Sequence, residues 1–146
     1  MQKFGLVVIG AHIGVHIKSE IEEYKNKLIL LVEPVPHNLR MLRENIQNYD
    51  TIKIEPVTIG QESKIKKFYF VKEQSVSNLG KHWASGIGSF DKKHILDHKT
   101  KRFKVSDDDI ESIDIKCLTF KELTDKYSIS HIDKLQIDVE GAEYEI

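Results

Sequence analysis

The chain has 146 residues, of which 40% are hydrophobic and 31% charged, a balance typical of one soluble globular domain. Its formal net charge of -1 gives no overall field that would favour binding to nucleic acid or to a membrane surface. Cys117 is the only cysteine, so no internal disulfide can form, which suits a reducing cytoplasm. No apolar stretch is long enough to span a bilayer, and the N-terminus lacks a signal-peptide cleavage pattern. We therefore expect a cytoplasmic domain without a membrane span.

The first part of the chain alternates strands and helices. Its apolar runs do not alternate with polar residues, as is typical of strands that are covered on both faces of a parallel sheet. Apolar residues at helical spacing follow each of the first two runs. The expected elements are a strand at 4–9, a helix at 13–24, a strand at 28–32, a helix from Pro36 to Ile46, and a strand at 52–59 interrupted at Pro56. This order predicts an α/β fold in which a mostly parallel sheet is flanked by helices.

The second part of the chain is less regular. The segment 65–71 is a candidate strand and hairpin arm, and residues 74–106 have no clear period, which indicates a long loop or insertion. A strand at 113–118 precedes a helix that a capping box of Thr119 and Glu122 should begin. A last strand is expected at 132–139, and the chain ends where a helix should follow. We therefore expect a single domain over residues 1–146, truncated at its C-terminus, with about four core strands.

A first group of candidate residues lies around the first turn. Gly10 and Gly14 stand between a strand and a helix, where glycine lets a ligand approach the backbone. Glu33 follows Gly14 by 19 residues (33 − 14), at the end of the second strand, where an acidic side chain can accept hydrogen bonds from a ribose diol. Because His12 replaces the middle glycine of a dinucleotide fingerprint, the pattern favours a nucleoside cofactor over NAD. A tight turn that binds nothing is the alternative.

A second group follows the last expected strand. Asp138, Glu140 and Glu143 lie at the carboxyl end of that strand, the edge where open α/β sheets bind ligands. Carboxylates there can orient a substrate hydroxyl, act as a general base or stabilise a positive charge. The alternative is that the two glutamates only complement the N-terminus of the following helix.

The histidines suggest weaker sites. His12 and His16, like His94 and His98, have the i, i+4 spacing of zinc ligands on a helix, but no third ligand is convincing, and we expect no metal site. His82 and His94 are second candidates for a base, after Asp138. Both would otherwise be exposed histidines of the irregular middle segment.

Together these motifs resemble the FkbM family of methyltransferases. The resemblance extends over most of the chain apart from about 74–106, and it is carried by VVIGAHIGVH at 7–16, LVEPVPHN at 31–38, Leu42, Asn45, VTIG at 57–60, CLTF at 117–120, IDKL at 132–135 and QIDVEGAE at 136–143. The sequence departs from the family pattern at Val8, where an aspartate is usual, at His12, where an asparagine is usual, and at Gln136, where a lysine is usual.

The resemblance implies a Rossmann-like methyltransferase fold and transfer of a methyl group from S-adenosylmethionine, typically to a hydroxyl oxygen of a sugar or natural product. A nucleic-acid methyltransferase is a further alternative, but the net charge and the lack of an Asn-Pro-Pro-Tyr-like element count against it, so we expect no nucleic-acid partner. The residues expected to hold the cofactor are Gly10, Ala11, His12, Gly14, Glu33, Pro34 and Asp138. The catalytic candidates are Asp138, Glu140, His82 and His94.

Two rival functions remain open. The chain could be a degenerate or truncated module that keeps the fold without catalysis, or an NAD-dependent oxidoreductase. Its oligomeric state also stays open, because a truncated sheet edge can pair with a second copy.

Overall fold

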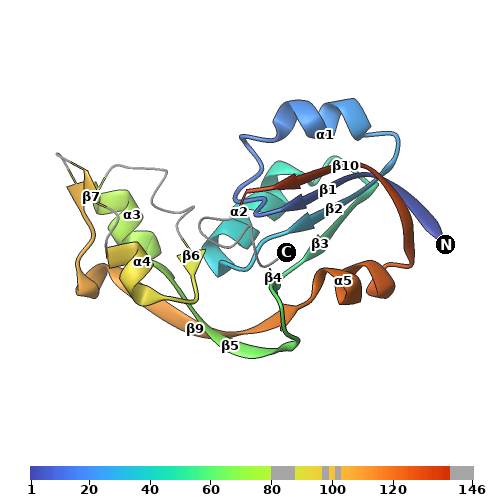
Figure 1. Cartoon of the computed structure of the whole chain (residues 1–146). Coiled ribbons are helices and arrows are strands. Elements are labelled where there is room, and N and C mark those ends of the chain that lie inside the picture. The colour runs from blue at the N-terminus through green and yellow to red at the C-terminus, as the bar shows by residue number, and fades with distance from the viewer. Residues whose placement is uncertain (80–87, 97–98, 101–102, 139–146) are drawn as a thin grey trace.

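The computed structural model describes residues 1–79, 88–96, 99–100 and 103–138 (Figure 1). In chain order its elements are β1 (Gln2–Ile9), α1 (Lys18–Tyr24), β2 (Leu28–Val32), α2 (Pro36–Asn45), β3 (Ile52–Glu55), β4 (Thr58–Ile59), β5 (Lys64–Val71), α3 (Glu73–Leu79), β6 (Gly88–Ser89), α4 (Lys92–Leu96), β7 (Lys99–Thr100), β8 (Phe103–Lys104), the 3₁₀ helix η2 (Asp107–Asp109), β9 (Ile110–Leu118), α5 (Phe120–Lys126) and β10 (Ile129–Ile137). Within these ranges, no helix has the length and apolar character needed to cross a membrane.

The first sheet is parallel throughout, as the unbroken apolar runs predict. Its strand order is β10-β1-β2-β3, so β1 lies between β10 and β2. In this register Ile9 lies beside both Val32 and Ile137. The carboxyl ends of β10, β1 and β2 therefore meet at one edge of the sheet, where ligands bind in open α/β folds.

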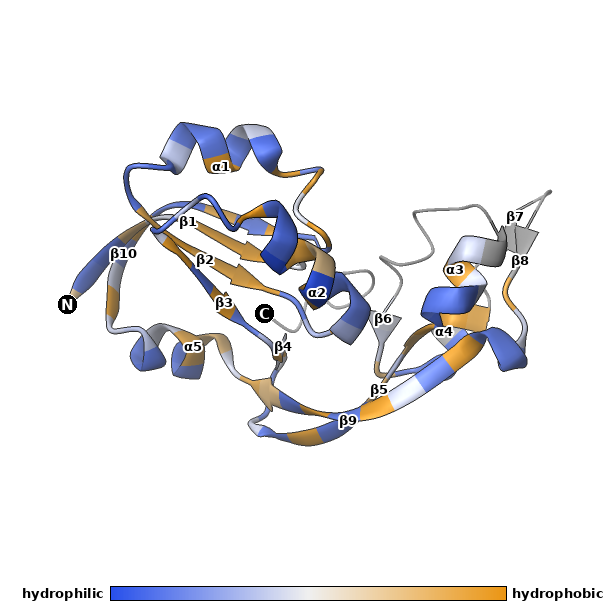
Figure 2. Cartoon of the chain, turned by 180° about the vertical axis from the view of Figure 1, so that it is seen from behind, coloured by the Kyte–Doolittle hydropathy of each residue, from blue (hydrophilic) through white to orange (hydrophobic). Residues whose placement is uncertain are grey.

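Helices cover both faces of the first sheet (Figure 1). On one face, β1 and β2 pack against Ile17, which directly precedes α1, and against Ile21 of α1 and Leu42 of α2. On the opposite face they pack against Leu123 of α5. Figure 2 shows the resulting hydrophobic colour along β1 and β2. Burial on both faces explains why these strands have no polar alternation.

The second sheet is built on a long antiparallel ribbon of β5 and β9. The pairing runs from Lys64 opposite Cys117 to Val71 opposite Ile110. β4 joins β9 in parallel, and β6 joins β5 in antiparallel orientation. The ribbon extends from the first sheet to α3 and α4 (Figure 1). The segment 65–71 is thus a strand with an antiparallel partner, although that partner is distant in sequence.

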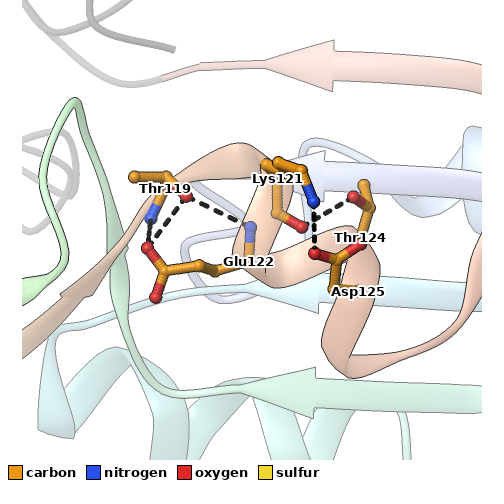
Figure 3. Close-up of polar contacts among 5 residues, drawn as sticks. All are labelled: Thr119, Lys121, Glu122, Thr124 and Asp125. Carbon is orange, nitrogen blue, oxygen red and sulfur yellow. Dashed lines mark hydrogen bonds and ion pairs between the residues drawn. The ribbon is translucent and has the colours of Figure 1, made fainter.

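The expected capping box begins α5 (Figure 3). The Glu122 N–H donates to Thr119 Oγ1 at 3.1 Å, and the Thr119 N–H donates to Glu122 Oε1 at 3.4 Å. Such a box satisfies donors that have no partner in the first turn of a helix. It fixes the start of α5 and turns Leu123 into the core, where this side chain is fully buried.

Several element boundaries differ from the sequence-based expectation, among them the start of β10 at Ile129, three residues before the expected position. α1 begins at Lys18 and not at residue 13, because His12 and Gly14 have φ of 56° and 86°, which no right-handed helix contains. The strand expected at 52–59 is two strands in different sheets, β3 and β4, separated around Pro56, which has no N–H to donate to a ladder. β9 begins at Ile110, earlier than expected.

The segment 74–106 is not a loop throughout. Its described part contains most of α3 as well as β6, α4, β7 and β8. Ile95 and Val105 are buried there against Val71 and Ile110 of the ribbon. These apolar contacts come from different short elements, so no single period in the sequence indicated them.

Candidate functional site

Residues 10–14 form a tight turn at the carboxyl end of β1. Gly10, His12 and Gly14 have φ of 90°, 56° and 86°, all in the left-handed region. Glycine adopts this conformation freely, whereas another residue such as histidine is disfavoured there by about 1–2 kcal/mol. A Cβ atom on Gly14 would also lie 2.9 Å from Leu42 Cδ1. Position 14 therefore requires glycine both for its conformation and for the close approach of α2.

Backbone donors of this turn are used inside the protein. The N–H groups of Gly10 and Ala11 donate to the Val32 carbonyl oxygen at 2.9 and 3.0 Å. The His12 N–H donates to Glu33 Oε1 at 2.8 Å. Phosphate-binding turns instead present such N–H groups to the ligand. The turn is thus held against the end of β2 and does not offer these three donors to a phosphate.

Glu33 lies directly after β2, as the sequence places it, and its side chain is buried. Its Oε1 accepts the His12 N–H, and its Oε2 accepts the Val35 N–H at 2.9 Å and Asn38 Nδ2 at 3.4 Å. A carboxylate has about four acceptor positions, so these bonds leave room at Oε1 for about one further donor. Glu33 therefore joins the turn to the start of α2 while keeping acceptor capacity.

The burial of Glu33 changes its protonation. Desolvation raises the pKa of the Glu33 carboxyl from 4.5 to about 7, although the hydrogen bonds from Val35, His12 and Asn38 act in the opposite direction. The side chain is only 5% exposed, so the loss of water outweighs the donors. The group that organises the turn therefore titrates near neutral pH.

Asp138 follows β10 at the same edge of the sheet. Its N–H donates to the Ile9 carbonyl oxygen at 2.8 Å, which fixes it beside the residue that precedes the turn. Its Oδ2 lies 3.3 Å from His16 Nε2, and the Asp138 and His16 side chains are 60% and 35% exposed. The edge thus carries an accessible histidine–carboxylate pair. Sequence reasoning missed this role of His16, although its place two residues after Gly14 put it near the same edge.

The spacing of His12 and His16 gives no zinc site by itself. Their ring centroids lie 6.0 Å apart. Within residues 1–79, 88–96, 99–100 and 103–138, no three His, Cys, Asp or Glu side chains are grouped so as to hold a metal ion.

The structure brings most of the expected cofactor residues to one place. The turn residues, Glu33 with the half-buried Pro34, and Asp138 all lie where β1, β2 and β10 end. Glu140 and His82 lie outside the described residues. His94 falls within α4, and its side chain is not among those described. The catalytic assignments of these three, like that of Asp138, stay predictions.

Val8 occupies the position of the usual family aspartate. It is fully buried and packs in the apolar cluster with Ile17, Ile21 and Leu31. The Val8 side chain therefore packs between β1, β2 and the helices, and it has no polar atom that could bind a cofactor.

A separate hollow of about 290 Å³ lies beside the start of α2, lined by Pro36, His37, Arg40, Phe70, Glu73 and Glu111. Arg40 pairs with Glu73, and His37 Nε2 lies 3.2 Å from the Val71 carbonyl oxygen. Because these polar groups have partners within the protein, the hollow has less to offer a cofactor than the edge that carries Asp138.

Fold and site together define a class of protein. A glycine turn after the first strand, an acidic residue after the second and a carboxylate after an adjacent strand are arranged as in α/β domains that bind nucleoside cofactors. The family model described as the methyltransferase FkbM domain matches residues 9–146. The chain belongs to this family of methyltransferase domains.

A solved structure shares the fold. The chain is similar to the crystal structure of methyltransferase FkbM from Methylobacillus flagellatus KT, with a TM-score of 0.50 and 15% sequence identity. The similarity covers 98% of this chain and 28% of that one, and at this identity it shows the fold. Among curated proteins no match was found.

Proposed function

We propose that the chain forms the cofactor-binding part of an S-adenosylmethionine-dependent methyltransferase that acts on a hydroxyl oxygen of a sugar or small natural product. The observation that carries the proposal is the convergence of the 10–14 turn, Glu33 and Asp138 at one edge of the parallel sheet. The choice of acceptor rests on the resemblance to the FkbM family.

The residues at this edge fit the chemistry of the cofactor. Glu33 keeps acceptor capacity for a ribose hydroxyl, and the exposed Asp138 carboxylate suits a neighbouring positive charge. The left-handed turn at Gly10 and Gly14 lets a ligand approach the backbone. When bound, the cofactor supplies a methyl group activated on a positively charged sulfur. Alignment of the acceptor oxygen with that group would supply much of the rate.

The geometry disfavours an NAD-dependent oxidoreductase. A dinucleotide needs free backbone donors for its pyrophosphate, usually at a helix N-terminus. Here the N–H groups of Gly10, Ala11 and His12 donate within the protein, and α1 begins only at Lys18.

The second candidate function is a module that keeps the fold without catalysis. The buried Val8, which replaces a polar family residue with core packing, favours it. Calorimetric titration with S-adenosylmethionine separates the two, because an active domain must bind the cofactor saturably. NADH serves as the ligand control and should give no heat of binding.

Glu33→Ala should weaken the affinity for S-adenosylmethionine at least tenfold, because it removes an acceptor and releases the His12 N–H. Glu55→Gln is the matched control, since Glu55 is also buried but binds Lys126 and Tyr127 of the α5 end. Equal affinity in the wild type and Glu33→Ala, measured on folded protein by calorimetry, would refute the ribose assignment.

A further inference from the structure

The described part of the chain contains two histidine–aspartate pairs in different settings. His16 Nε2 lies 3.3 Å from Asp138 Oδ2 at the carboxyl end of β10. His131 Nε2 lies 2.9 Å from Asp133 Oδ1 near the beginning of the same strand. Only the first pair adjoins the 10–14 turn, so the second is a built-in control for the chemistry of such a pair.

The pairing determines which ring nitrogen of His16 is available. The neutral imidazole donates from one nitrogen and accepts at the other. Because Nε2 faces the Asp138 carboxylate, the N–H belongs on Nε2 and the lone pair on Nδ1. A carboxylate in this position holds the ring in one tautomer and stabilises the imidazolium that forms when Nδ1 takes a proton.

The pair is held at the candidate site by the backbone. Asp138 is anchored by the bond from its N–H to the Ile9 carbonyl, and His16 lies two residues after Gly14. The His16 side chain is partly exposed, which leaves it open to a substrate. The 10–14 turn, the Asp138 carboxylate and the His16 ring therefore lie at one edge of the sheet.

We propose that His16 is the general base of the methyl transfer and that Asp138 positions its ring. This inference rests on the proposed function. The hydroxyl proton passes to His16 Nδ1 while an oxygen electron pair forms the bond to the methyl carbon, whose bond to sulfur breaks with its electrons left on the sulfur.

A histidine suits this task better than an exposed aspartate alone. A general base works best when its pKa lies near the operating pH. Histidines titrate mostly between about pH 5 and 8, whereas carboxylates do so near about pH 4. Asp138 is thus better used as the partner that supports a charged ring.

Other charged groups surround His16 and must be separated from it in any pH experiment. The carboxylate of Glu20 in α1 interacts electrostatically with His16. Lys134 Nζ of β10 lies 4.0 Å from Glu20 Oε1. The His12 ring centroid lies 6.0 Å away. Burial raises the pKa of the nearby Glu33 to about 7, so its charge also changes between the two pH values, but it would contact the ribose that both analogues below share.

The test compares two cofactor analogues by calorimetry at about pH 5.5 and about pH 8. S-adenosylhomocysteine lacks the methyl group, and sinefungin carries a protonated amine in its place. Neutral Nδ1 of His16 accepts a hydrogen bond from that amine, whereas a protonated ring repels it. The preference of the wild type for sinefungin over S-adenosylhomocysteine should therefore be about tenfold greater at the higher pH.

In His16→Asn this pH dependence should vanish while the affinity for S-adenosylhomocysteine stays within about twofold of wild type. His131→Asn should keep it. A dependence that survives in His16→Asn, or that is absent from the wild type, overturns the assignment. Failure of the wild type to bind S-adenosylhomocysteine refutes the proposed function and this inference with it. Thermal melts verify folding, with His16→Gln as the substitute if His16→Asn is unfolded.

Discussion

The buried carboxylate of Glu33 is the residue on which the shape of the site depends. It accepts hydrogen bonds from the turn at His12, from Val35 and from Asn38, and so it connects β1, β2 and α2. A carboxylate with several N–H partners is usually kept ionised by them, but here the loss of water has the larger effect. The same residue therefore organises the turn and makes the stability of the domain depend on pH.

The stability should fall as the pH rises from about 5 to about 8. The pKa of Glu33 is about 7 in the folded protein and 4.5 in the unfolded reference, so between these values the folded state binds more protons. The free energy of unfolding then decreases with pH, by about 3 kcal/mol for this residue as an upper figure. Urea unfolding of the wild type and Glu33→Gln measures the effect. The advantage of the wild type should shrink toward pH 8, and parallel pH profiles would contradict the account.

His16 and Asp138 show how far residue-level prediction could reach. Asp138 was predicted as a site residue because it lies at the carboxyl end of the last expected strand, which is a local signal. Its partner His16 was not, because the pair depends on β10 lying next to β1. Strand neighbours that are distant in sequence leave no local pattern.

At the scale of single elements, local signals decide where a helix begins. Thr119 and Glu122 predict the start of α5, and the structure shows both reciprocal bonds. The start of α1 was misplaced because apolar spacing continued through a turn whose left-handed residues no helix accepts. The strand expected at 52–59 was misjudged because hydrophobicity does not reveal which sheet a strand joins.

Thr119→Ala should lower the free energy of unfolding by about 1 kcal/mol, because the N–H of Glu122 loses its acceptor. Thr124→Ala in the same helix is the control (Figure 3). Its hydroxyl donates to the Lys121 carbonyl oxygen on an exposed face, so its loss should change stability by less than about 0.5 kcal/mol. Urea titration of both variants gives the comparison, and equal losses would show that the capping box contributes nothing specific.

At the scale of the whole molecule, the parallel sheet and its helical layers followed from the order of apolar runs. The β5–β9 ribbon did not, because its two strands are separated by the segment 74–106 in the sequence. Val35, directly before α2, packs in one cluster with Phe68, Phe70 and Ile115 of this ribbon. The second sheet is therefore packed against the residue that follows Glu33 and Pro34, which ties the candidate site to both sheets.

In the function proposed for this chain, the ends of β1, β2 and β10 form one cofactor site. Amide NMR of the labelled chain during titration with S-adenosylhomocysteine tests it most directly. The largest shifts are expected at Ala11, His12, Glu33 and Asp138, with little change at Gln2 and Ser130 at the opposite edge. Saturable shifts confined to other residues, or no shifts at any ligand concentration, would contradict it.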